Sequence, residues 1–312
     1  MPTDARARPG AGYGAGPVTK APAWHGLVAW DMLFNNLTTG LFLVAALAEL
    51  VAPEVFTPVA KAAYPLALGL LLVDLVCLVL DLGDPLRFHH MLRVFKPTSP
   101  MSLGTWCLTI YSLPLTVAAA LSLLPAAGPA LEGARKAAVV LGLLPALGSA
   151  VYKGVLLSTN AQPGWRDARW LGGYLTSSAL LLGCAEMLVL SIVMGQERAA
   201  ALLRPALELL LLLNLVGLGL LLVDVRAALP RAYTPRALVR LGVLGPGGGF
   251  LVPLCLLIVG SPLLMLGGVL LIVLGALLIR FEIVYLPHVL ARASEARGML
   301  TTPTEKVRAG PQ

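Results

Sequence analysis

Long apolar segments separated by short polar stretches run along almost the whole chain. A helix needs about 20 mostly apolar residues to cross a bilayer, and eight such segments can be distinguished here. Backbone polar groups cannot stay unpaired in lipid, so we predict that each segment is a helix. The expected segments run approximately over residues 26–51, 62–82, 100–125, 136–159, 169–194, 205–229, 243–260 and 262–285. The predicted fold class is an all-α integral membrane protein, an eight-transmembrane-helix bundle.

The bundle is expected to form one membrane domain over residues 24–288. Residues 1–23 are rich in Pro, Gly and Ala, which predicts a flexible N-terminal tail. A cleaved signal peptide is not expected, because no apolar stretch precedes Trp24. Residues 289–312 are predicted to be a polar C-terminal tail.

Composition agrees with a chain dissolved in lipid. The sequence is 58% hydrophobic and 12% charged, whereas soluble domains are nearer half apolar and about a quarter charged. The net charge of +7 is typical of membrane topology and of contact with anionic headgroups. We therefore expect the lipid bilayer, and not nucleic acid, as the partner of the basic residues.

An even number of spans places both termini on one side of the membrane, here named side A. By this reading 16 of the 23 Lys and Arg residues lie in tails and loops of side A. The positive-inside rule then predicts cytoplasmic termini. A basic docking surface for an acidic partner would produce the same imbalance.

Metal centres are not expected within this chain. The cysteines stand singly in apolar segments, without C-x-x-C pairs, at Cys77, Cys107, Cys184 and Cys255. The four histidines fall at span ends or in loops, whereas a haem anchor needs histidines that face one another inside spans. We expect no metal site, haem or iron–sulfur cluster.

Polar residues near side A are expected to meet in one pocket. Asp31 and Asn35 lie one helical turn apart, and Tyr152 is in the last turns of the fourth segment. Because successive spans alternate in direction, these positions lie on the same side of the membrane as the 83–99 loop. The group expected to converge consists of His25, Asp31, Asn35, His89, His90 and Tyr152. Such donors and bases suit a quinone headgroup, which needs hydrogen-bond partners and proton acceptors. Alternatively, Asp31 caps or pairs locally and Tyr152 is an interfacial anchor.

Other ionisable groups occur inside or at the ends of the spans, where they are costly and by default functional. A proton path is predicted to use Asp74, Asp81, Glu186, Asp224, Arg280 and Glu282. The alternative is pairwise neutralisation between helices, with Lys153 and Arg280 as the cations.

The longest polar interruption in the first half of the chain, Asp81–Trp106, carries a family resemblance. LDLGDPLRFHHML (Leu80–Leu92) and PTSPMSLGTW (Pro97–Trp106) resemble signature runs of the NrfD/PsrC family. YKGVLLS (Tyr152–Ser158) and LLIRFEIVY (Leu277–Tyr285) are similar to its Tyr-x-Gly run and its last-helix Arg-aromatic run. This family contains the quinone-reactive membrane subunits of polysulfide-reductase-type complexes.

The resemblance implies a quinone-reactive subunit in a multi-pass arrangement in a bacterial inner membrane, active only within an oxidoreductase complex. It implies menaquinone or ubiquinone as the cofactor and a ferredoxin-like iron–sulfur subunit that docks on the 83–99 loop side. A molybdopterin or cytochrome subunit would complete the complex. The expected catalytic residues are Asp31, Tyr152 and His25, and the expected quinone-binding residues are Asn35, Arg87, His89 and His90.

Two other functions remain open at this point. A proton-coupled secondary transporter could use the buried acids, although matched helix breaks in repeated halves are not evident. A passive anchor without bound quinone is the third possibility.

Overall fold

The computed structural model describes residues 24–82, 84–124, 128–160, 162 and 164–301, with side chains as far as residue 293. Within these residues the fold is all-helical, and eight helices are long and apolar enough to cross a membrane. This confirms the predicted fold class. The elements are α1 (Gly26–Val51), α2 (Pro53–Leu80), η1 (Pro85–Leu92), α3 (Pro100–Ser122), α4 (Pro129–Ser158), α5 (Leu171–Val193), α6 (Glu197–Val225), α7 (Leu229–Ala232), α8 (Pro235–Gly242), η2 (Val243–Leu251), α9 (Val252–Val259) and α10 (Pro262–Thr301).

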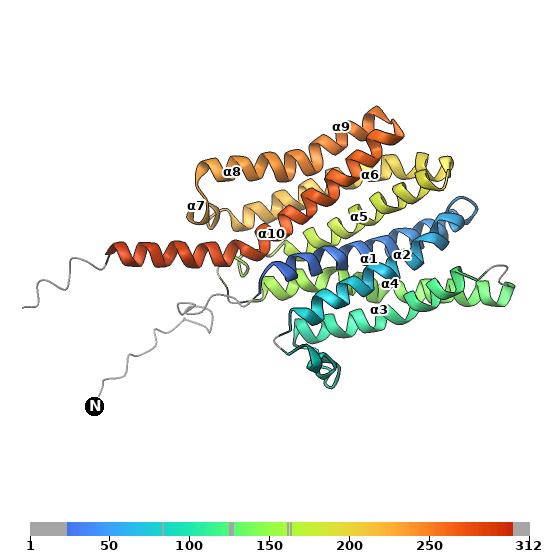
Figure 1. Ribbon diagram of the computed structural model, residues 1–312, viewed down its shortest axis with the longest axis horizontal. Coiled ribbons are helices and arrows are strands. Elements are labelled where there is room, and N and C mark those ends of the chain that lie inside the picture. The colour runs from blue at the N-terminus through green and yellow to red at the C-terminus, as the bar shows by residue number, and fades with distance from the viewer. Residues whose placement is uncertain (1–23, 83, 125–127, 161, 163, 302–312) are drawn as a thin grey trace, which may run out of the picture.

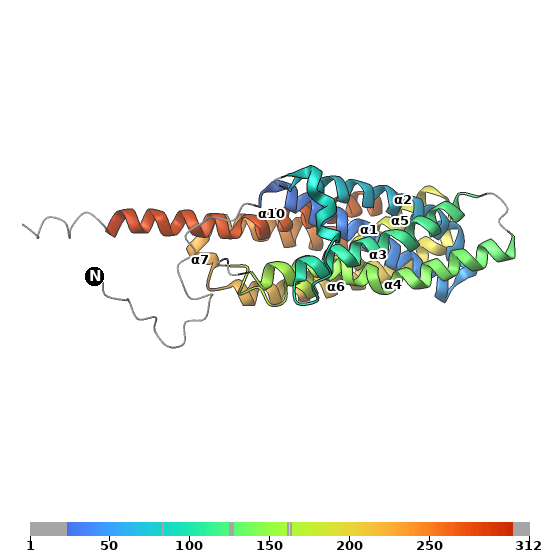
Figure 2. The same ribbon diagram turned by 90° about the horizontal axis from the view of Figure 1, so that it is seen from below.

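The long helices lie side by side along one axis (Figures 1 and 2). α1 packs against α2, α4, α5 and α10 and is therefore the central helix of the bundle. α3 and α4 form one flank, while α6, α8, α9 and α10 form the other (Figure 1). α1 begins and α10 ends at the same end of the bundle, as an even number of spans requires (Figure 1).

Several helices extend beyond the expected spans. α2 begins at Pro53, α4 at Pro129 and α6 at Glu197, each earlier than its apolar run indicates. The first turns of α2 and α4 carry a proline, whose missing N–H costs nothing there. Polar residues in these added turns made them resemble loops in the sequence.

The seventh span differs most from expectation. It runs over Pro235–Val259 and is not the short segment predicted from residue 243. Its glycine-rich middle, η2, is a π-helical stretch, and the span ends at Gly260, whose φ of +80° is left-handed. α10 likewise continues past the predicted end of its span to Thr301.

Glycine contacts hold the central helices close together. A Cβ atom on Gly40 of α1 would lie 1.9 Å from the carbonyl oxygen of Ala179 in α5. A Cβ on Gly183 would lie 2.0 Å from the backbone of Gly40. Small residues permit such backbone approach, and in lipid the resulting van der Waals contact drives helix association. The α1–α5 crossing thereby fixes the faces that α1 turns toward α2, α4 and α10.

Candidate functional site

A lysine and two carboxylates meet in the interior, one from each of three helices. Lys153 Nζ of α4 lies 2.7 Å from Asp31 Oδ1 of α1 and 3.3 Å from Asp74 Oδ1 of α2. The same ammonium donates a hydrogen bond of 2.9 Å to the backbone oxygen of Asp31. Asp74 is fully buried, and Asp31 and Lys153 are only 5% and 6% exposed. One ammonium is therefore shared by two carboxylates at membrane depth.

Asn35 extends this cluster by one helical turn along α1. Its amide donates to Ser149 Oγ of α4 at 3.0 Å and to Asp74 Oδ2 at 3.4 Å. Its Oδ1 atom is buried and has no hydrogen-bond partner among the described residues. An unsatisfied buried acceptor is costly, so this oxygen is available to a donor from a ligand.

Tyr152 borders the cluster and is held by a glycine of α3. A Cβ atom on Gly104 would lie 1.9 Å from the Tyr152 ring, so the ring fills the space that a larger residue would occupy. Tyr152 is 7% exposed, and its ring centroid lies 5.6 Å from Lys153 Nζ. This placement agrees with the prediction that Asp31, Asn35 and Tyr152 lie close together.

Arg280 of α10 contacts another face of α1. Its guanidinium donates to Asn36 Oδ1 at 2.5 Å, to Ser178 Oγ at 3.1 Å and to the Met32 oxygen at 3.2 Å. It is fully buried and forms no ion pair with a described carboxylate. Hydrogen bonds to neutral oxygens compensate the charge only in part.

The charges around α1 therefore balance only as a group. Asp31 and Asp74 carry two negative charges when ionised, and Lys153 beside them carries one positive charge. Arg280 supplies a second positive charge on another face of the helix. Because Lys153 is the cation that contacts both carboxylates in the described part of the chain, a proton bound to one of them would neutralise the ion cluster locally. This arrangement suits a site that accepts and releases a proton.

His25 and Asp81 lie between the cluster and side A. His25 precedes α1 and is exposed, with its ring centroid 5.3 Å from that of His288. Burial and the negative charge of Asp31 raise the pKa of the Asp81 carboxyl, and His25 opposes this shift. Asp81 therefore holds a proton more readily than an ordinary surface aspartate.

The other expected ligands of the pocket lie apart from it. Arg87, His89 and His90 are exposed on η1, which packs on α2 and α3. Arg87 Nε forms an ion pair of 2.9 Å with Asp84, and the two histidine rings contact each other. No hydrogen bond or ion pair between described residues joins η1 to the Asp31–Lys153 cluster.

The remaining residues of the predicted proton path are dispersed. Asp224 accepts a hydrogen bond of 2.9 Å from the Trp170 backbone at the start of α5. Glu282 accepts one of 2.6 Å from the Tyr233 hydroxyl. Glu186 of α5 has a buried Oε2 atom without a hydrogen-bond partner in the described part of the chain. Of the path residues, Asp74 belongs to the cluster and Asp81 lies near it.

Sequence reasoning considered Lys153 only as a cation that could neutralise buried acids between helices, and its ion pairs with Asp31 and Asp74 agree with that alternative. Sequence reasoning missed a second ion cluster toward the opposite end of the bundle. Arg135 was predicted to lie in a loop, whereas it is fully buried in α4 and forms an ion pair with Glu49 of α1. Tyr64 donates to Glu49 Oε2 at 2.7 Å, and Glu132 Oε1 lies 2.5 Å from Arg135 Nη2.

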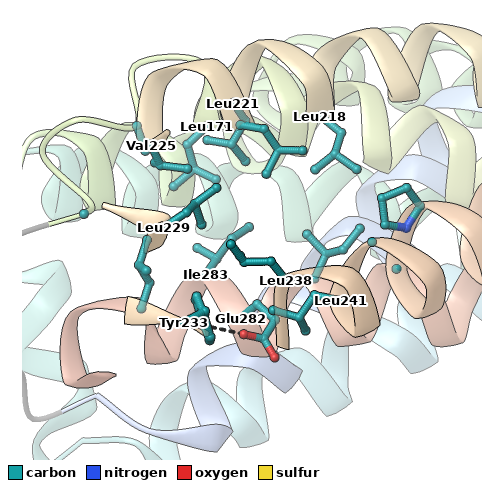
Figure 3. A pocket seen from close by; sticks show the side chains of 18 of the residues that line it. Leu171, Leu218, Leu221, Val225, Leu229, Tyr233, Leu238, Leu241, Glu282 and Ile283 are labelled. Carbon is teal, nitrogen blue, oxygen red and sulfur yellow. Dashed lines mark hydrogen bonds between the residues drawn. The ribbon is translucent and has the colours of Figure 1, made fainter. Parts of the chain in front are cut away.

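A cavity of about 360 Å³ lies in the other half of the bundle, between α5, α6, α8 and α10 (Figure 3). Its walls are almost entirely apolar. None of the residues of the Asp31–Lys153 cluster lines it. The cluster and the cavity are therefore separate features of the molecule.

Comparison with known proteins places this architecture in a family. A family model described as polysulphide reductase, NrfD, matches residues 18–293, which cover the whole eight-helix bundle. No curated protein sequence matches the chain significantly. The match spans most of the chain and agrees with the order of its motifs and with its eight spans. The chain belongs to the NrfD family, the membrane subunits of polysulphide-reductase-type oxidoreductase complexes.

Proposed function

We propose that this chain exchanges electrons between the membrane quinone pool and an iron–sulfur partner subunit, and that its quinone site is the Asp31–Lys153 cluster. The observation that carries the proposal is the sharing of Lys153 by Asp31 and Asp74 at membrane depth. This group contains one carboxylate more than its ammonium can neutralise by direct contact, and a buried charge is costly unless it is paired. A proton on one carboxylate would remove the excess charge.

The residues of the cluster fit a quinone or quinol headgroup. Carbonyl oxygens of a quinone accept hydrogen bonds, and Lys153 and Tyr152 are donors. Hydroxyl groups of a quinol donate, and the buried Asn35 Oδ1 lacks a donor in the described structure. Both oxidation states would therefore find partners among side chains from α1 and α4.

The exposure of these side chains indicates which of them a quinone headgroup would contact first. Asp31, Lys153 and Tyr152 retain 5–7% exposure, while Asp74 has none. A headgroup that approaches from lipid or from side A would meet the first three, with Asp74 behind them. The cluster is closely packed here, so binding requires these side chains to separate.

A bound quinol supplies two electrons, which pass to the iron–sulfur partner, and two protons. Within the chain, Asp31 is the proposed acceptor of both protons, one after the other with release in between, because it is the more exposed of the two carboxylates. Lys153 stabilises the ionised carboxylates before transfer and holds Asp31 in position through its backbone oxygen. Asp81 and His25 would then pass each proton to side A, a role that the raised pKa of Asp81 supports.

We further propose that the iron–sulfur subunit docks on η1 and the residues after it. This surface exposes Leu86, Phe88 and Phe95 beside the basic side chains of Arg87 and Arg93. Large apolar side chains among basic residues are typical of an interaction surface. The histidines of η1 would lie at this interface instead of in the quinone pocket. A catalytic molybdopterin or cytochrome subunit of a bacterial inner-membrane complex would then receive or supply the electrons.

Proton translocation is a further part of the proposal. Toward the other end of α1, Thr38 Oγ1 lies 3.0 Å from the Tyr111 hydroxyl. Glu49 and Tyr64 follow beyond them. Glu186, whose Oε2 has no hydrogen-bond partner among the described residues, is the carboxylate proposed to connect the Thr38–Tyr111 pair with Glu49 and Tyr64.

The test uses the complete complex, purified with its partner subunits, and a short-chain quinol. Asp31→Asn and Tyr152→Phe should each lower quinol turnover at least ten-fold, since positioned acid–base groups contribute about 10²–10⁴-fold. Asp167→Asn is the matched control, because Asp167 is an exposed carboxylate at the same end of the bundle. Unchanged quinol turnover in both site variants would refute the site assignment.

A further inference from the structure

The cavity in the second half of the bundle lies toward side A, where α6 ends and α8 begins. Leu218, Leu221 and Val225 of α6 form one wall, and Leu238 and Leu241 of α8 face them (Figure 3). Its volume of about 360 Å³ lies within the usual range of ligand pockets, roughly 300–1,000 Å³. The cavity is therefore large enough for a ligand.

Polar side chains that line the cavity already form hydrogen bonds within the protein. The Tyr233 hydroxyl donates to Glu282 Oε2 at 2.6 Å (Figure 3). Burial and this hydrogen bond raise the pKa of Tyr233, so its hydroxyl remains a donor. Trp165 Nε1 donates to the Ile283 backbone oxygen at 2.7 Å. A buried water needs two to four polar partners, which these engaged groups do not offer, so the space suits hydrocarbon.

Access to the cavity is from the bilayer-facing surface. Leu222 of α6 and Gly242 of α8 line the cavity and are both exposed. α6 and α8 belong to membrane-spanning segments, so the surface between them faces lipid. A hydrocarbon chain could pass between these two helices without crossing water.

Basic side chains surround the side-A end of this cavity. Four exposed arginines each lie within two residues of a lining residue: Arg226, Arg231, Arg236 and Arg240. From residue 225 to residue 281 the sequence contains no Asp or Glu. In the described part of the chain no ion pair or hydrogen bond engages these four guanidinium groups. Two acids border this stretch, Asp224 and Glu282, and each accepts a hydrogen bond, from the Trp170 backbone and from Tyr233 respectively. The four arginines outnumber them, so the end of the cavity carries a net positive charge.

From this combination we propose that the cavity holds one acyl chain of an anionic phospholipid, with the phosphate bound by arginines of α7 and α8. Basic pockets between transmembrane helices bind anionic lipid headgroups. The apolar walls accept the chain, and the charge selects the headgroup. The site is independent of the quinone cluster, because the two share no residue.

The test measures lipid retention by native mass spectrometry of the full chain. The protein is exchanged into detergent containing equal amounts of phosphatidylglycerol and phosphatidylcholine with identical acyl chains. The wild type should retain one phosphatidylglycerol in preference to phosphatidylcholine. The double variant Arg236→Gln/Arg240→Gln should lose about five-fold of this preference for each arginine, the equivalent of about 1 kcal/mol. Arg198→Gln, an exposed arginine at the opposite end, should leave it unchanged.

A second variant tests the cavity itself. A Cβ atom on Gly242 meets nothing within 4 Å, and Gly242 lines the cavity, so the ring of Gly242→Phe is expected to obstruct the opening. It should reduce retention of both lipids. Gly69→Phe is the control, since Gly69 of α2 is equally open but distant from the cavity.

A measurement in solution complements the mass spectra. Phosphatidylglycerol with brominated acyl chains should quench the fluorescence of Trp165, which lines the cavity. Trp165→Phe should abolish this increment of quenching. Equal retention of the two lipids by the wild type would overturn the proposal, as would a preference that Arg236→Gln/Arg240→Gln leaves intact. Recovery of a quinone from the cavity in place of phospholipid would also overturn it.

Discussion

Arg135→Met provides a quantitative test of the ion cluster toward the opposite end of the bundle. Arg135 is fully buried and donates from both terminal nitrogens to the Glu49 carboxylate. It also contacts Glu132 at 2.5 Å. Methionine fills a similar volume but removes the charge, so Glu49 would keep only the hydrogen bond from Tyr64.

The magnitude follows from the burial of the charge that remains. Glu49 is 2% exposed, and breaking a buried pair by removing one partner costs about 3–5 kcal/mol. The double variant Arg135→Met/Glu49→Gln removes both charges and should recover most of this loss. Lys61→Met is the matched control. Lys61 forms an ion pair of 3.2 Å with Glu132, with side-chain exposures of 38% and 27%, and ion pairs that water reaches contribute about 0–1 kcal/mol.

The assay is reversible denaturant unfolding in detergent micelles, followed by helix content and compared among the four proteins at one pH. The predicted order of stability is wild type, close to Lys61→Met, then the double variant, then Arg135→Met. A single variant that loses less than about 1 kcal/mol would refute the assignment of a buried ion pair. A double variant as unstable as the single one would refute the reasoning about the uncompensated charge.

Two further predictions concern packing and pH. Gly40→Ala should prevent close contact of α1 with α5, because the new Cβ would lie 1.9 Å from the Ala179 oxygen. We expect a loss of folded protein in size-exclusion chromatography. Gly69→Ala is the control and should behave as wild type, because a Cβ at Gly69 meets open space. Burial and Asp31 raise the pKa of Asp81 in the folded chain. The Asp81 carboxyl therefore binds its proton more tightly in the folded state than in the unfolded state. Its ionisation costs stability as pH rises through the raised pKa. Asp81→Asn should therefore gain stability relative to wild type as pH increases above the ordinary aspartate range, and a constant difference between the two proteins from acidic to neutral pH would contradict this.

The eight spans could be predicted from sequence because length and apolar character determine which segments dissolve in lipid. The starts of α2 and α4 could not, since charged residues near these starts interrupt the apolar pattern. Lys61 of α2 pairs with Glu132 of α4, and Arg135 of α4 pairs with Glu49 and Glu132. Arg135 illustrates the reason: its flanking residues resemble a loop, and its ion-pair partner Glu49 is distant in sequence. The seventh span was shortened in the same way, because Arg236 and Arg240 lie on a helix whose other face is apolar.

The grouping of Asp31, Asn35 and Tyr152 could be predicted because helix periodicity and span parity place them at one depth. Their joining through Lys153 could not, because it depends on which face α4 turns toward α1 and α2. Contacts such as Gly104 against Tyr152 and Gly40 against α5 set that rotation, and neither is encoded by local periodicity. The histidines of η1 were expected in the pocket because parity fixes only the side of the membrane and not the lateral position.

The location of quinone binding is the central claim, and photo-crosslinking tests it most directly. An azido-quinone bound to the purified complex, activated by light and mapped by mass spectrometry, should label residues 25–35 of the first span and 149–153 of the fourth. An excess of unlabelled quinone should abolish the label, and Lys153→Met should reduce it. Specific labelling confined to the cavity between α6, α8 and α10, with none on the first and fourth spans, would contradict the proposed quinone site.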